Sequence, residues 1–305
     1  MKWRGRGMAA TPLAMTMRRF SIQPLAVGAL ALLIGLSLAA AAAPLLAHLL
    51  DIDANAIDLF NRFAAASADH PLGTDELGRD VLLRLLQGGR ASLLVGVAAA
   101  ITAATIGTAV GLAAGYLGGT ADALLMRIAD GFMALPLLPL LIVLAAIDPA
   151  KIGIAPDVAA SPIAGVLRII VIISLVGWTG VARLVRAEAL HLREEPFVLA
   201  ARAQGAGTAR ILAVHILPNL ASSIIVATTL AAGNIILLES VLSFLGLGIQ
   251  PPIPSWGNML TNAQEIINIS PLLAVWPGLV ILLTVACCNL LGDALQVALD
   301  PRRRS

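Results

Sequence analysis

The sequence is poor in charge. Only 12% of its 305 residues are Asp, Glu, Lys or Arg, whereas 59% are hydrophobic. Soluble domains carry about 25% charged residues, so this composition excludes a soluble domain and indicates an integral membrane protein. The formal net charge of +2 is too small to indicate a nucleic-acid partner.

Cysteine and lysine are scarce. Cys287 and Cys288 are adjacent inside an apolar run, which excludes a disulfide framework, and we expect both thiols to pack against neighbouring helices. The two lysines, Lys2 and Lys151, are not in the Gly-x-x-x-x-Gly-Lys-Ser/Thr setting that holds nucleotide phosphates. We therefore expect the chain to bind no ATP and no cofactor of its own.

Motifs of hydrolytic enzymes are missing as well. The sequence has no His-Glu-x-x-His pair for a metal hydrolase and no Gly-x-Ser-x-Gly elbow for a serine hydrolase. Its four histidines are scattered and lack metal-ligand spacing. We therefore predict a chain that is not an enzyme and holds no metal.

Long apolar runs predict an all-α, polytopic membrane protein with six transmembrane helices. A span needs about 20 apolar residues, and six runs provide them: 24–50, 91–115, 128–147, 162–184, 220–245 and 271–291. Residues 91–298 are expected to form a core of five spans, with 24–50 as a separate first span. Pro136 and Pro139 should bend the third.

The distribution of basic residues predicts the orientation. Most of the 20 Lys and Arg residues fall in segments that this topology places inside, as the positive-inside rule requires. Residues 1–23 and 299–305 are therefore expected to be cytoplasmic tails.

Segment 51–90 is expected to lie outside. It has too few large apolar residues for a core of its own, so it should pack on the membrane surface and against a partner. Thr74 is expected to cap an interfacial helix that begins at Asp75. The apolar face of that helix would consist of Leu77, Val81 and Leu85.

A glycine repeat predicts a close contact between helices. Gly107, Gly111, Gly115 and Gly119 recur every four residues and share one helix face, so another helix can approach them closely.

The fifth span carries Asn234 and Glu239. A carboxylate in hydrocarbon normally faces a partner or a water-filled cavity. Two alternatives follow. Either both residues are candidates for a translocation path, or Glu239 pairs with Asn234 or with a polar group of a neighbouring helix.

The longest polar interruption of the second half is 186–219. Gly205 and Gly207 divide it and Pro218 is expected to close it, so the pattern predicts a short helix, a glycine turn and a second short helix. A loop of this length with helical pattern favours a docking surface. The alternative is an elbow that packs only on its own bundle.

The first of these short helices should begin at Pro196. Phe197, Val198 and Leu199 would then form an exposed apolar patch of the kind that marks an interaction site. We expect Arg193 and Arg202 at its polar rim.

This loop resembles a known one. Leu199-Ala200-Ala201, Gly205 and His215-Ile216-Leu217-Pro218 are similar to the EAA loop of ATP-binding-cassette importer permeases, which runs Glu-Ala-Ala, Gly, Ile-x-Leu-Pro. Leu199 stands where that pattern has Glu, and His215 where it has Ile. With segments 70–80, 242–259 and 289–302, the chain from about residue 70 resembles the dipeptide, oligopeptide and nickel permeases, of the second-subunit type.

The resemblance implies a permease subunit in a bacterial inner membrane that forms half of a path for peptides, or alternatively for nickel or another small solute. It implies four partners: a second homologous permease, two cytosolic ATPases that bind ATP and Mg, and an extracytoplasmic solute-binding protein. Coupling to the ATPases would involve Arg193, Pro196, Phe197, Val198, Leu199, Ala200, Ala201, Arg202, Gly205, His215 and Pro218. A self-sufficient secondary transporter or channel is the rival hypothesis, with Glu239 as its one clear ion-coupling group.

Overall fold

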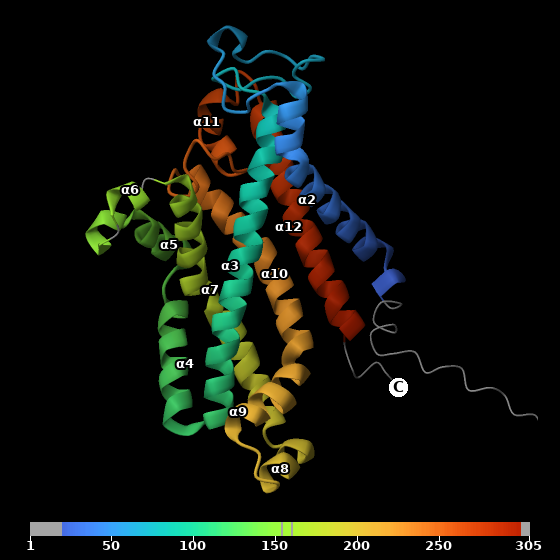
Figure 1. Ribbon diagram of the computed structural model, residues 1–305, viewed down its shortest axis with the longest axis vertical. Coiled ribbons are helices and arrows are strands. Elements are labelled where there is room, and N and C mark those ends of the chain that lie inside the picture. Colours follow the sequence, from blue (N-terminus) through green and yellow to red (C-terminus); the bar gives the residue numbers. More distant parts are fainter. Residues whose placement is uncertain (1–19, 154, 160, 300–305) are drawn as a thin grey trace, which may run out of the picture.

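The computed structural model describes residues 20–153, 155–159 and 161–299 (Figure 1). Within this part the chain is helical and has no strand, only an isolated bridge between Thr74 and Asp80. The long helices are α2 (Pro24–Leu50), α3 (Val81–Leu117), α4 (Gly119–Ala134), α5 (Leu137–Ala146), α7 (Pro162–Leu192), α10 (Leu217–Phe244) and α12 (Leu272–Leu299). The short ones are α6 (Pro156–Ala159), α8 (Pro196–Ala203), α9 (Thr208–Arg210) and α11 (Ala263–Ile266).

The all-α polytopic fold is confirmed. In the described residues, five helices are long and apolar enough to cross a membrane, and α4 with α5 form a sixth span if this pair, bent by 90°, is counted as one. The predicted tails 1–23 and 299–305 fall largely outside the described residues.

The bundle is built around α3. Helix α3 packs against α7 along much of its length and also contacts α10 and α2, while α12 packs on α10 and α2. Figure 1 shows α8 and α9 at one end of the bundle and α11 at the other. We refer to these as the α8 end and the α11 end.

A glycine face joins α3 to α7, as the four-residue spacing predicts. A Cβ on Gly107, Gly111 or Gly115 would lie 2.6–2.7 Å from a backbone oxygen of α7, so the two backbones touch where these glycines are. Gly119 does not continue this face, because it begins α4 and a Cβ there would meet nothing within 4 Å.

The predicted start of the interfacial helix is wrong. Helix α3 begins at Val81 and not at Asp75, because Asp80 is its N-cap and accepts a hydrogen bond from Leu83 N at 2.7 Å. Thr74 caps no helix; its hydroxyl accepts from Ala64 N at 2.8 Å and so ties the preceding loop together.

Residues 116–127, which separate the predicted spans 91–115 and 128–147, do not form a polar turn. Helix α3 continues to Leu117, Gly118 turns the chain with φ +67°, and α4 begins at once. The expected bend occurs where α4 ends, because Pro136 forces Leu135 into extended backbone with φ −84° and ψ 139°.

Pro218 does not close the loop. The helical path runs from Thr208 to Phe244, with a π-helical segment, η3 (Ile211–Ile216), between α9 and α10. A proline has no N–H and its ring clashes with the carbonyl four residues earlier. The chain accommodates it by widening, and Leu217 N donates to Leu212 O, five residues back.

Candidate functional site

Helix α8 is attached to the bundle through one apolar face. Val198 is fully buried and packs in a cluster with residues of α7, η3 and α10: Val181, Val185, Ala189, Ile211, Ile216 and Leu220. Ala201, one turn later, is buried as well. The expectation that Val198 belongs to the exposed patch is therefore wrong, because the helix needs this face to attach to the bundle.

The other face of α8 is open. Phe197 is 41% exposed and Leu199 is 44% exposed, and Ala200 is exposed between them. Two large apolar side chains thus project from a short helix whose orientation is fixed by Val198. Helix α8, which carries these exposed apolar side chains, lies at the tip of the molecule (Figure 1).

Two arginines contact the end of α3: Arg193, at the C-cap of α7 just before α8, and Arg202, within α8. Arg193 donates to Gly115 O at 3.2 Å and to Glu194 at 2.9 Å. Arg202 donates to the Tyr116 hydroxyl at 3.4 Å, and its guanidinium lies 5.6 Å from the centre of the Tyr116 ring. Beyond the predicted rim position, each arginine therefore has a structural contact to α3.

The turn residues of the loop are placed as follows. Pro196 is the first residue of α8, as predicted, and Gly205 has φ +81°, a backbone conformation that glycine adopts readily. His215 is half-buried in η3, and its carbonyl accepts from the Asn219 side chain at 2.7 Å. Pro218 is exposed in the first turn of α10.

Two ion pairs join α4 to α7. Arg186 forms a two-pronged contact with the Asp122 carboxylate, of which the Nη2–Oδ2 bond is 2.6 Å long. Arg183 binds Asp130 on the next turns. These pairs were not predicted from the sequence, in which their members are 64 and 53 residues apart.

The second candidate region is the carboxylate of Glu239 on α10, which is completely buried. Ser92 of α3 donates to its Oε2 at 2.9 Å, and Ser243 donates to its Oε1 at 2.7 Å. Asn234, by contrast, is exposed and makes no contact with Glu239 that would pair them. The Glu239 carboxylate therefore bonds to a neighbouring helix, and in this conformation it does not face an open path.

The same serines bind the loop that follows α10. Ser92 Oγ accepts from Trp256 N at 3.2 Å, and Ser243 Oγ accepts from Ile249 N at 3.0 Å. The Trp256 indole, also buried, donates to Leu85 O at 2.9 Å. Glu239 is thus the centre of a polar network that connects α10, α3 and the loop at the α11 end.

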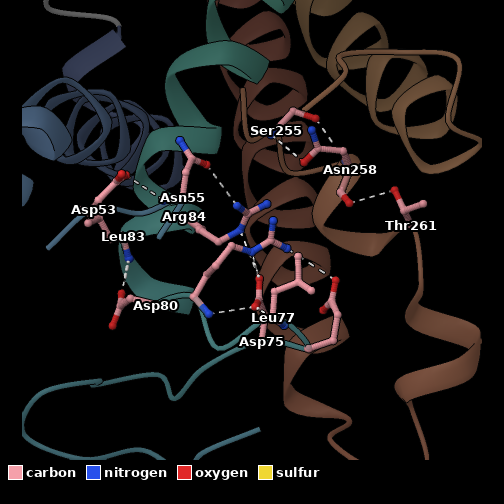
Figure 2. Close-up of polar contacts among 12 residues, drawn as sticks. Asp53, Asn55, Asp75, Leu77, Asp80, Leu83, Arg84, Ser255, Asn258 and Thr261 are labelled. Carbon is pink, nitrogen blue, oxygen red and sulfur yellow. Dashed lines mark hydrogen bonds and ion pairs between the residues drawn. The ribbon is translucent and has the colours of Figure 1, made fainter. Parts of the chain in front are cut away.

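A charged cluster fixes the segment between α2 and α3 at the α11 end. Figure 2 shows Arg84 of α3 between Asp75 and Asn55, with Arg84 Nε 3.4 Å from Asp75 Oδ2 and Arg84 Nη1 3.4 Å from Asn55 Oδ1. Arg79 Nε donates to the same Asp75 oxygen at 2.7 Å. Asp75 and Arg84 are buried, so each charge depends on the other for its stability.

Fold and site together define the class of protein. It is a polytopic helical membrane protein whose spans α7 and α10 are joined by a helix-bearing loop with exposed apolar side chains.

Comparison with known proteins gives the family. Residues 107–305 match the family described as binding-protein-dependent transport system inner membrane component, and the chain belongs to it. It is an integral inner-membrane permease of the ATP-binding-cassette importers. The loop with α8 lies within the matched residues.

Curated relatives agree. The chain is 40% identical over 293 residues to a putative peptide permease of Brucella suis, covering 95% of this chain and 91% of the relative. It is 36% identical to the oligopeptide transport system permease protein of Bacillus subtilis, covering 94% and 89%. It is 42% identical over 245 residues to the dipeptide transport system permease protein of Alkalihalophilus pseudofirmus, covering 80% and 76%.

Proposed function

We propose that this chain is a permease subunit of a peptide importer. The similar proteins named above are permeases for peptides, dipeptides and oligopeptides, and a further relative, 41% identical over 239 residues, is a glutathione permease of Pectobacterium atrosepticum. Glutathione is itself a small peptide. This common chemistry supports peptides over nickel as the transported class.

The proposed assembly has four other chains. A second, homologous permease would form the other half of the path, two cytosolic ATPases would bind ATP and Mg, and an extracytoplasmic binding protein would deliver the peptide. The chain itself would be non-catalytic. The α8 end would face the cytoplasm, with both termini on that side, as the distribution of Lys and Arg predicts.

One observation carries the mechanism: α8 is attached firmly on one face and apolar on the other. Phe197 and Leu199 would insert into a groove on an ATPase. Because Leu199 stands where the EAA pattern has Glu, this docking would depend little on charge. When the ATPases close on ATP, they would displace α8. Through Val198 the displacement would reach η3 and α10, and through Arg193 and Arg202 it would reach α3.

Reconstitution tests this function. The permease pair, the ATPases and the binding protein are assembled in vesicles, and uptake of radiolabelled tri-alanine is measured with and without ATP. The proposal predicts peptide uptake that requires ATP and the ATPases. Uptake of nickel but not of peptide would refute the substrate class, and uptake that follows an ion gradient without the ATPases would favour a secondary transporter.

A further inference from the structure

The α11 end contains a cavity that no role above explains. Its volume is about 560 Å³, within the range of pockets that bind small molecules. It lies where α2, α3, α7 and the proline-rich stretch before Trp256 meet. The residues that line it are Pro44, Asn55, Gln87, Arg90, Ala91, Leu94, Ile163, Val166, Pro252, Ile253 and Pro254.

The chemistry of the lining is that of an anion site. Arg90 is the one charged residue among the lining residues, and its guanidinium forms no ion pair or hydrogen bond with any other described residue. Gln87 lies one turn earlier on the same face of α3 and lines the same cavity. No acid lines the cavity, so nothing there would repel a carboxylate.

Asn55 is held in place by the charged cluster. Arg84 donates to its side-chain oxygen, as Figure 2 shows, so the amide N–H groups of Asn55 remain available as donors. Asp75 fixes Arg84 in turn. The cluster that anchors the segment between α2 and α3 therefore also positions a donor at the cavity.

The proline-rich wall is fixed as well. The Asn258 amide donates to Ile249 O at 3.2 Å and to Ile253 O at 2.9 Å, and this pins the stretch that carries Pro252 and Pro254. Leu94, Val166 and Ile253 add apolar surface to the lining. The cavity thus combines one cation, two amides and an apolar wall.

From these observations we infer that the cavity receives the carboxyl-terminal end of a transported peptide. Arg90 binds the terminal carboxylate through two parallel N–H donors, Asn55 and Gln87 bind peptide carbonyl groups, and the apolar wall accepts side chains of varied shape. Peptides of different sequence share only their backbone and their termini. A site of this composition therefore recognises what all of them have, and it adds a specificity determinant to the permease proposed above, on whose peptide transport it rests.

The test compares the uptake of two peptides by the wild type and by one variant. Initial uptake of tri-alanine and of tri-alanine amide, which lacks the terminal carboxylate, is measured in the complete vesicle system with wild type and Arg90→Gln. Because the binding protein is the same in both, its own preference cancels when the acid-to-amide ratios are compared. We expect Arg90→Gln to lower tri-alanine uptake about tenfold and to leave tri-alanine amide uptake unchanged, since a hydrogen-bonded charge pair of this kind is lost only for the acid.

Two controls make the result specific. Arg90→Lys keeps the charge but not the two parallel donors, and should retain part of the preference for the acid. Lys151→Gln removes an exposed cation outside the cavity and should leave the ratio as in wild type. Membrane levels and bound ATPase are measured for every variant, so that a failure to assemble is recognised.

The outcomes separate the two proposals. An unchanged acid-to-amide ratio in Arg90→Gln overturns the cavity assignment while peptide import stands. Equal loss of both peptides, or loss of assembly in Arg90→Gln and Arg90→Lys alike, identifies the cavity as a contact with a partner chain and also overturns it. If wild type imports neither peptide, peptide transport itself is refuted and the inference falls with it.

Discussion

Adding one methyl group to Gly111 should separate the two central helices. A Cβ at this position would lie 2.6 Å from Ala182 O and 2.8 Å from Val185 Cβ. Neither atom is the end of a flexible side chain, so α3 and α7 must move apart. The same movement loosens the contacts of Gly107 and Gly115 with α7. These two glycines lie as close to the α7 backbone as Gly111 does.

Two opposing terms set the size of the effect. Overpacking of this kind costs about 1–3 kcal/mol, whereas alanine favours the helix over glycine by about 1 kcal/mol. The two contacts below 3.0 Å place the steric cost in the upper part of its range, about 2–3 kcal/mol, so Gly111→Ala should lower the free energy of unfolding by about 1–2 kcal/mol. Gly180→Ala on α7 is the matched control, because a Cβ there meets nothing within 4 Å and only the favourable term remains.

The chain contains its own reporter for this assay. Cys287 and Cys288 are both buried in α12 and become reactive to a thiol dye when the bundle opens on heating. A loss of 1 kcal/mol lowers the midpoint temperature by about 2–4 °C for a protein of this size. If Gly111→Ala unfolds at or above the wild-type temperature while Gly180→Ala behaves as expected, the contact between α3 and α7 is not as tight as the argument requires.

Two further predictions use the same thermal assay. Glu239→Ala should destabilise by about 1–3 kcal/mol because the Ser92 and Ser243 hydroxyls lose their acceptor, and Glu239→Gln, which keeps one acceptor oxygen, should lose less; equal stability of the two variants would contradict the network. Asp122→Asn and Arg186→Gln should show a coupling energy of about 0.5–1 kcal/mol in a double-mutant cycle, since the pair is two-pronged and only partly exposed; additive losses would mean that the pair contributes nothing.

The sequence predicted the spans because their signal is local. An apolar run of about 20 residues identifies a transmembrane helix wherever it occurs, and glycines four apart identify one face of it. The start of the α8 helix at Pro196 and the reversal at Gly205 were also predicted, since both follow from the backbone preferences of those residue types.

The contacts of the site could not be predicted in this way. Ser92 and Glu239 are 147 residues apart and meet only because α3 packs on α10. Val198 looked like its neighbours Phe197 and Leu199, because three consecutive apolar residues do not reveal which one faces the bundle. The π-helical segment before Pro218 was missed because a proline normally indicates the end of a helix, and here the chain widened and continued.

The N-cap of α3 at Asp80 shows why the predicted helix start was wrong. Thr74 followed by Asp75 is a reasonable N-terminus by composition. Asp75, however, forms ion pairs with Arg79 and Arg84, whereas Asp80 accepts from Leu83 N through Oδ1 while its Oδ2 contacts His70. The sequence analysis proposed only Thr74 as the cap, and the ion pairs of Asp75 are tertiary contacts that composition does not reveal.

Capture of the ATPase by a single pair of variants tests the central claim most directly. Phe197→Asp places a charge on the exposed face of α8, and Phe60→Asp places the same charge on a fully exposed phenylalanine between α2 and α3. Both variants should insert into the membrane and unfold at the wild-type temperature, since neither side chain belongs to the core. The account predicts that purified Phe197→Asp permease retains less than about a tenth of the bound ATPase, as expected for the loss of an interface anchor of about 1.4 kcal/mol or more, while Phe60→Asp retains all of it. Full retention of the ATPase by Phe197→Asp, with peptide uptake at the wild-type rate, would contradict the claim that α8 is where the ATPase acts.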